Sequence, residues 1–190
     1  QTCALPIFDR KGILWFTLQQ ADMVGRLDPA TGDVKLVKSR SGTRPYGIKI
    51  DANDVPWFSC NGSECLVKIN PETMELTEVK LPSPGTTVRR LDIGEDGIIW
   101  YVNSSLGKLG RYDPRSGAIK EWDSPSGPRS HPYAIAVLDG IVWYNESGVR
   151  PDMLVRFDPK TETFQSWPVP SGGVYAGIVR HMRSEEHTSE

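Results

Sequence analysis

Side chains suited to binding or catalysis gather at two kinds of position in this chain. One is the start of a short strand-like segment, and the other is the loop after the next such segment. The first positions carry Tyr46, Arg89, Arg90, His131, Tyr133 and His181, and the second carry Asn103, Asn145, Glu146 and Arg150. Arginine donates paired hydrogen bonds to anions, and tyrosine offers a flat stacking face. Brought together, these groups suit an anionic or polyamide ligand; left apart, they are ordinary solvated loop residues.

Glu146 is the only acid at its place among the loops, since the equivalent positions carry Leu18, Cys60 and Asn103. A carboxylate there could act as a general base or as a metal ligand. The other interpretation is that Glu146 is a salt-bridge partner of a neighbouring arginine, Arg129 or Arg150.

A metal site would need further oxygen ligands, and Asn103 and Asn145 could supply them beside Glu146. Two histidines, His131 and His181, lack a metal-ligand spacing to another His or Cys. The candidate catalytic residues are therefore Glu146 and His181, and the candidate metal ligands are Asn103, Asn145 and Glu146.

These positions recur because the chain repeats itself. A Trp-Phe/Tyr unit begins at Trp15, Trp57, Trp100 and Trp143, and an Asp/Asn-Pro unit begins at Asp28, Asn70, Asp113 and Asp158. Both landmarks keep a period of about 43 residues, which is typical of a β-propeller with one four-stranded blade per repeat. We predict an all-β chain of about four blades, with the four tryptophans packed between neighbouring blades.

Each repeat divides into four expected strands. In the second to fourth repeats the first strands are expected at 46–50, 90–93 and 133–138, and the second strands at 56–59, 98–102 and 141–145. The third strands are expected at 66–69, 108–112 and 153–157, and the fourth strands at 76–81, 119–122 and 164–167. Alternating strand directions place the loops after the second and fourth strands on one face. These loops vary between repeats, whereas the other turns do not. We therefore expect a small-molecule or peptide ligand on the face with the variable loops.

The two ends of the chain read as an artefact rather than as part of the fold. One DNA sequence that encodes 183–190 has a reverse complement that encodes 1–7, and the string resembles a sequencing adapter. We therefore expect the blades within 8–182.

The bulk composition argues against two classes of function. The 22 basic and 24 acidic residues give a net charge of -2 without a basic stripe, so we expect no nucleic-acid partner. No apolar run approaches the roughly 18 residues of a membrane-spanning helix. The oligomeric state and the substrate stay open.

Two cysteines, Cys60 and Cys65, flank the four-residue loop 61–64. Paired positions that close a hairpin lie within disulfide range. A disulfide would favour a periplasmic or secreted location slightly over a cytoplasmic one, where both thiols would stay reduced.

The recurring pattern P-Y/H-G-I, D-x-x-G-x-x-W-F-T, I-G-R-I/L-D-P-x-T-G and E-W/F-P-x-P resembles the streptogramin B lyases, or virginiamycin B lyases, over 8–182. The resemblance implies a seven-bladed propeller, of which about three blades would be missing here. It also implies an antibiotic-resistance activity, a Mg²⁺-dependent elimination that linearises a cyclic depsipeptide at its ester. Glu146 matches the family's catalytic glutamate, whereas the family's histidine two residues later is replaced by Gly148.

Two further functions stay open beside the lyase. One is a non-catalytic propeller that binds a ligand or a partner protein on the same face. The other is a Ca²⁺-dependent hydrolase of the gluconolactonase type, which needs a Glu, Asn and Asp set around one metal ion.

Overall fold

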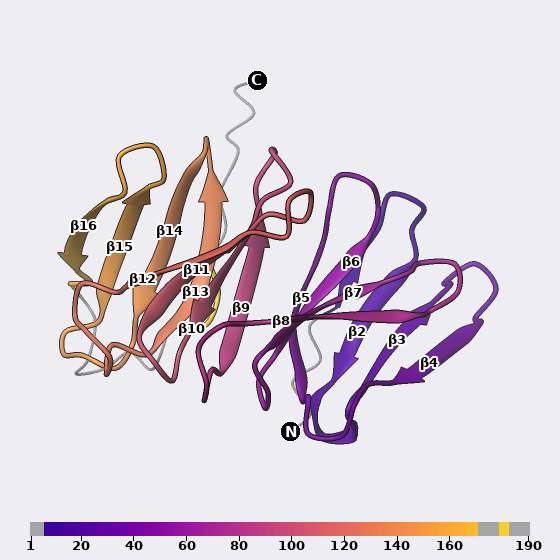
Figure 1. Ribbon diagram of the computed structural model, residues 1–190. Helices are drawn as coiled ribbons and strands as arrows, with labels where there is room; N and C mark the ends of the chain where they lie inside the picture. The colour runs from indigo at the N-terminus through magenta and orange to yellow at the C-terminus, as the bar shows by residue number, and fades with distance from the viewer. Residues whose placement is uncertain (1–5, 171–178, 183–190) are drawn as a thin grey trace.

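Four antiparallel sheets follow one another along the chain (Figure 1). The structure is a computed structural model that describes residues 6–170 and 179–182. The first sheet contains β1 (Ile7–Phe8), β2 (Leu14–Leu18), β3 (Met23–Leu27) and β4 (Val34–Lys38), with a short 3-10 turn, η1 (Gln19–Ala21), between β2 and β3. The second contains β5 (Pro45–Ile50), β6 (Pro56–Cys60), β7 (Cys65–Ile69) and β8 (Leu76–Lys80). The third contains β9 (Val88–Ile93), β10 (Ile99–Asn103), β11 (Lys108–Tyr112) and β12 (Ile119–Asp123), and the fourth contains β13 (Pro132–Leu138), β14 (Ile141–Glu146), β15 (Met153–Asp158) and β16 (Thr163–Pro168).

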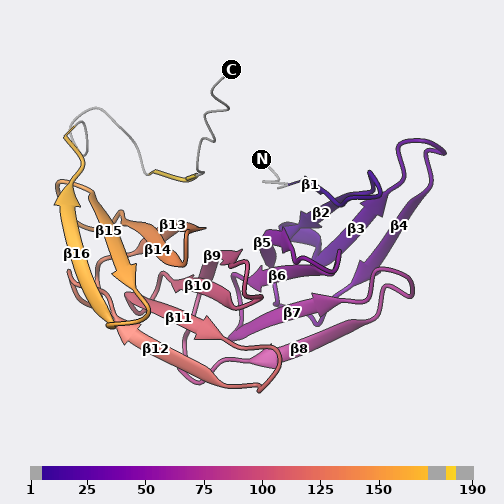
Figure 2. The same ribbon diagram turned by 90° about the horizontal axis from the view of Figure 1, so that it is seen from above.

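The four sheets lie side by side in an arc, as the blades of a β-propeller do (Figure 2). The first strand of each blade (β1, β5, β9 and β13) lies on the inner side of the arc, and the fourth strand lies on the outer side. We call the surface formed by the four first strands the inner wall. The predicted propeller is confirmed, and the expected strands agree with the observed ones to within two residues. Within the described residues, no helix is long and apolar enough to cross a membrane.

The core consists of apolar layers between neighbouring blades. Trp15 of the first blade packs in one buried cluster with Ile48 and Phe58 of the second. Trp57 and Trp100 do the same toward the third and fourth blades, respectively, as predicted. Trp143 differs, because it is only half-buried and stacks on Trp167 of its own blade, with ring centroids 6.1 Å apart.

The turns between third and fourth strands are built alike in all four blades. In the first blade the Asp28 side chain accepts a hydrogen bond from the N–H of Ala30, and its carbonyl accepts one from Gly32. Asn70, Asp113 and Asp158 make the equivalent bonds. The last residue of each turn has a positive φ even where it is Met74 (65°) or Glu162 (55°). The Asp/Asn-Pro landmark is thus a local turn signal that positions the outer strand.

Candidate functional site

Hydrogen bonds join the loops that follow the second and fourth strands, so these loops share one face, which we call the loop face. The Asp22 carboxylate, after β2, accepts from the N–H groups of Gly42 (2.8 Å) and Arg44 (2.6 Å), before β5. The Glu64 carboxylate likewise accepts from the N–H of Gly85 at 2.9 Å. Each of these loop pairs is therefore fixed by its own hydrogen bonds, and the loops have a defined position next to the inner wall.

The inner strands of the second, third and fourth blades are bulged just below the loop face. The regular strand register is interrupted between Pro45 and Ile48, between Pro132 and Ile135, and opposite Tyr101 to Asn103 in the third blade. A β-bulge leaves residues unpaired and re-aims their side chains. The bulged segments carry four of the predicted ligand-binding residues, Tyr46, Arg89, Arg90 and Tyr133.

The carbonyl groups of two bulges are tied to the preceding blade. The Thr17 hydroxyl donates to the carbonyl of Tyr46 at 2.8 Å, and the Ser59 hydroxyl donates to the carbonyl of Arg89 at 3.2 Å. Both hydroxyl groups are buried. The backbone of the bulges is therefore held in place, so that the side chains leave it in fixed directions.

Tyr46 and Tyr133 meet on the inner wall although they belong to the second and fourth blades. Their hydroxyl groups hydrogen-bond to each other, and their rings meet edge to face with centroids 6.4 Å apart. Both residues are buried. The pair forms a single aromatic platform beside the inner strand of the third blade, β9.

Arg89 and Arg90, on β9, lie against this platform. The Arg89 guanidinium carbon lies 5.4 Å from the Tyr133 ring centroid and 5.9 Å from that of Tyr46. For Arg90 the distances are 6.0 Å and 5.3 Å. These are cation–π distances, so the two rings hold both guanidinium groups. We call the four residues the Arg–Tyr cluster.

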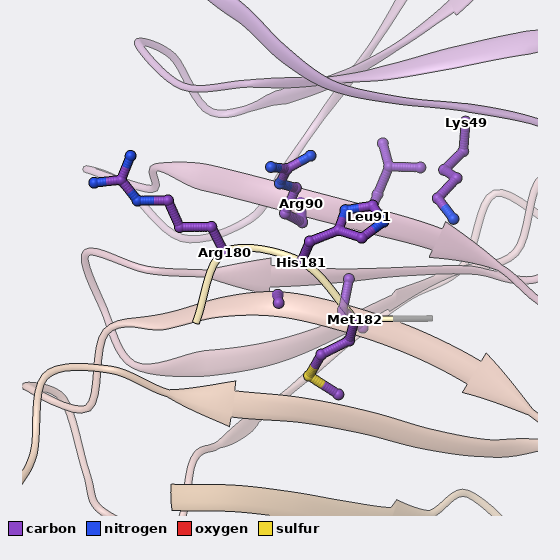
Figure 3. Close-up of a pocket in the computed structure, with 8 residues that line it drawn as sticks. Lys49, Arg90, Leu91, Arg180, His181 and Met182 are labelled. Carbon is purple, nitrogen blue, oxygen red and sulfur yellow. The ribbon is translucent and has the colours of Figure 1, made fainter. Parts of the chain in front are cut away.

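A small cavity of about 20 Å³ lies next to the Arg–Tyr cluster, which is room for about one water molecule. It is lined by Lys49, Arg90, Leu91, Ala134, Ile135 and the segment 179–182 through Arg180, His181 and Met182. Figure 3 shows the His181 ring beside Leu91, between Arg90 and Lys49 in this view. Lys49 forms an ion pair with Asp92 at 2.8 Å. The inner wall is thus predominantly cationic here, and the segment 179–182 places His181 against it.

Glu146 does not lie free at the rim of the channel, because its carboxylate is buried under the loop between β12 and β13. It accepts hydrogen bonds from the Ser124 hydroxyl (2.6 Å), from the N–H of Ser126 (2.9 Å) and from the Ser126 hydroxyl. Ser124 also bonds to the Tyr144 hydroxyl at 2.8 Å, and burial raises the pKa of Tyr144 above its ordinary value. Neither Arg129 nor Arg150 forms a salt bridge with Glu146, and Arg150 pairs instead with Asp152 at 2.9 Å.

Asn103 and Asn145 belong to two other hydrogen-bond networks. The Asn103 amide donates to the Thr86 hydroxyl at 2.9 Å, and its oxygen accepts from Ser105 and Leu106. The Asn145 oxygen accepts from the N–H of Ala134 at 2.8 Å. The Asn145 amide nitrogen is buried without a hydrogen-bond partner among the described residues.

The three predicted metal ligands, Asn103, Asn145 and Glu146, therefore do not converge on one point through any contact in the described chain. All their side-chain oxygens already accept hydrogen bonds from protein donors. In the ranges 6–170 and 179–182, no group of three or more His, Cys, Asp and Glu residues is placed to hold a metal ion. As placed here, Asn103, Asn145 and Glu146 do not form a Mg²⁺ site together.

Gly148 and His131 face each other across the fourth blade's loops. A β-carbon added to Gly148 would lie 2.1 Å from the carbonyl oxygen of Arg129 and 2.5 Å from the His131 ring. The exposed His131 has a φ of 46°, and its carbonyl accepts from the Ser147 hydroxyl at 2.8 Å. A histidine in place of Gly148 would require this loop to move.

Cys60 and Cys65 form a disulfide across the hairpin between β6 and β7, with Cα atoms 5.3 Å apart. Cys60 pairs with Pro45 of the inner strand, as Asn103 pairs with Val88 and Glu146 with Pro132. The three residues Cys60, Asn103 and Glu146 therefore occupy one equivalent position in three blades. We call it the loop-anchor position, because each residue there fixes a loop of the loop face.

Sequence reasoning missed the partners of these residues. Ser124, Ser126 and Thr86 lie in loops with no regular pattern, and no spacing links them to Glu146 or Asn103. The alternation of side chains between the two faces of β14 could have predicted the burial of Glu146. It places Glu146 on the same face as the buried Tyr144 and on the opposite face from Trp143.

Together these features describe a propeller with a bulged, cationic inner wall and a defined loop face. The model of the Virginiamycin B lyase family matches residues 3–179, so this chain belongs to that family. No match was found among curated protein sequences.

Solved structures agree on the fold. A catalytically inactive variant of virginiamycin B lyase from Staphylococcus aureus with quinupristin aligns with a TM-score of 0.80 and 23% identity, covering 90% of this chain and 57% of that one. The selenomethionine-substituted enzyme gives the same values. A streptogramin B lyase structure covers 88% of this chain and 55% of its own length, also at 23% identity and TM-score 0.80. This chain thus spans little more than half the length of these proteins.

Proposed function

We propose that this chain is part of a lyase that linearises a cyclic depsipeptide of the streptogramin B class by elimination. The observation that carries the proposal is that an imidazole, His181, and a guanidinium, Arg90, line the same cavity on the inner wall. Family membership supports the reaction class, and the Arg–Tyr cluster offers cationic and aromatic groups to a polyamide ring.

Elimination at the ester of such a ring needs a base and a leaving group that can carry a negative charge. The base removes the proton from the α-carbon beside the ester-bearing carbon, and the electrons form a carbon–carbon double bond. The carbon–oxygen bond then breaks, and the carboxylate leaves with the bonding electron pair. We assign the base to His181 rather than to Glu146, because both Glu146 oxygens accept hydrogen bonds from serines.

Magnesium dependence stays a prediction from the family resemblance. Since Asn103, Asn145 and Glu146 do not fit a metal site, we derive no step of the reaction through Mg²⁺. Turnover measured with added Mg²⁺ and with EDTA tests the prediction directly.

A second candidate is a non-catalytic propeller that binds a peptide or a related ligand on the loop face. The engaged carboxylate of Glu146 and the absence of a histidine at Gly148 favour it. The gluconolactonase-type hydrolase has less support, because it needs a metal-centred carboxylate set that the described residues do not form.

The Cys60–Cys65 disulfide supports a periplasmic or secreted location for this chain, because such bonds persist in oxidising compartments.

The lyase proposal is tested by incubating the full chain with quinupristin and analysing the product by mass spectrometry. Elimination opens the ring without changing the mass, whereas hydrolysis adds the mass of one water. We expect the unchanged mass with wild-type protein, loss of turnover in His181→Asn, and normal turnover in Arg115→Gln on the opposite face. Binding of quinupristin without turnover would contradict the lyase and support the non-catalytic binding propeller. A mass gain of one water would contradict the lyase and support the hydrolase.

A further inference from the structure

The Arg–Tyr cluster brings two positive charges to one place on the inner wall. Arg89 and Arg90 are successive residues, and both guanidinium groups lie within 6.0 Å of the same two tyrosine rings. Like charges this close repel each other, most strongly where protein replaces water around them. The cation–π contacts hold the groups in position, but no counter-ion for either charge lies among the residues that the structure describes.

No carboxylate of the described chain neutralises this pair. The nearest acid along β9, Asp92, is already engaged by the Lys49 ammonium at 2.8 Å and by the N–H of Val137 at 2.8 Å. The Nε atoms of Arg89 and Arg90 are both buried and without a hydrogen-bond acceptor in residues 6–170 and 179–182. Buried donors are paired in nearly all native structures, so these two indicate a missing acceptor.

We propose that Arg89 and Arg90 bind the carboxylate group of a ligand on the inner wall. Both side chains are partly exposed, so that a ligand can reach them. The planar guanidinium fork matches a carboxylate bidentately. The cavity beside Arg90 gives room there for a small polar group such as a carboxylate oxygen.

The inference rests in part on the proposed function and makes it more specific. Ring opening by elimination leaves the bonding electron pair on the departing carboxylate, while the proton goes to the base. Arg89 and Arg90 would then neutralise the new negative charge and hold the linear product. Binding of a carboxylate does not itself require turnover.

The test is calorimetric titration of the full chain at low salt with N-acetylphenylalanine and, as a matched probe, its uncharged amide. We expect the acid to bind at least about tenfold more tightly than the amide, because a charged pair of hydrogen bonds is lost in the amide. Arg89→Gln and Arg90→Gln should each weaken binding of the acid about tenfold, and Arg89→Lys should weaken it less. Arg115→Gln, on the opposite face, is the control and should bind normally.

Three results would overturn the inference. One is equal binding of acid and amide, and another is unchanged binding in Arg89→Gln and Arg90→Gln variants whose circular dichroism matches wild type. The third is inorganic sulfate binding more tightly than the acid, which would make the site one for tetrahedral anions. Quinupristin turnover is measured separately. If the chain binds the carboxylate but does not turn over quinupristin, the lyase proposal is refuted and the carboxylate site at Arg89 and Arg90 still stands.

Discussion

The hydroxyl groups of Tyr46 and Tyr133 hydrogen-bond to each other although 87 positions separate them in the chain. Tyr46 belongs to the second blade and Tyr133 to the fourth, so the bond passes beside the third blade's inner strand. It is a direct contact between non-neighbouring blades, and it supports the two arginines that lie against the rings.

Removal of this bond should destabilise the protein measurably. We expect Tyr46→Phe and Tyr133→Phe each to lower the free energy of unfolding by about 1 kcal/mol, the usual net value of a neutral hydrogen bond. The double variant should lose less than the sum of the two, because the second change removes a bond already broken. Urea denaturation of all four proteins completes the cycle, and strictly additive losses would contradict the bond's role.

Glu146 should matter for stability whether or not the protein is catalytic. Glu146→Gln replaces one of the two carboxylate oxygens by an NH₂ group, which donates and cannot accept, so Ser124 or Ser126 loses its acceptor. We expect a loss of about 2 kcal/mol in urea denaturation, because a buried hydroxyl or N–H that loses its acceptor costs roughly 1–3 kcal/mol. The exposed Glu95→Gln is the control. A variant as stable as wild type would show that the carboxylate does not anchor the loop.

Asp22 should make the first blade's loops sensitive to acid. The N–H of Gly42 donates to its carboxylate and lowers the Asp22 pKa below the ordinary value of 3.8. A lowered pKa in the folded state gives stability that is present above 3.8 and is lost as the pH falls through the folded-state pKa. Asp22→Asn should therefore be less stable than wild type at pH near 7, and the difference should shrink below about pH 4. Thermal unfolding across this range, with exposed Asp33→Asn as control, checks the sign; a difference independent of pH would refute it.

The Cys60–Cys65 disulfide should stabilise the second blade modestly. It closes a loop with a sequence separation of only 5, and constraint of so short a loop in the unfolded chain is worth about 2 kcal/mol. The double variant Cys60→Ser, Cys65→Ser should lose this amount in urea denaturation. Dithiothreitol should lower the midpoint of wild type to that of the variant and leave the variant unchanged. A response of both proteins to the reductant would point to another cause.

The fold could be predicted from the sequence because its signals are local and repeated. The tryptophans and the Asp/Asn-Pro turns each depend on short-range chemistry, and each occurs once per blade. The gathering of Tyr46, Tyr133, Arg89 and Arg90 also follows from the repeat, since all four stand at the start of an inner strand.

The surroundings of Glu146 could not be predicted in the same way. Its partners Ser124 and Ser126 come from a variable loop, whose path depends on long-range contacts. The bulges are equally hidden, because Tyr46 and Arg89 read as ordinary strand residues until the register across to β6 and β10 is known. The sequence predicted that Glu146 would lie near Asn103 and Asn145 as one group of ligands. In the structure these side chains belong to separate hydrogen-bond networks.

The loop-anchor position has a consequence for how such a protein diversifies after gene duplication. Cys60, Asn103 and Glu146 accomplish the same fastening by a covalent bond, an amide network and a carboxylate network. A copied blade can therefore acquire a different loop when this residue and its partners change together, while its strands stay unchanged. In these three blades the strands can stay constant while the anchor residue and its partners change together.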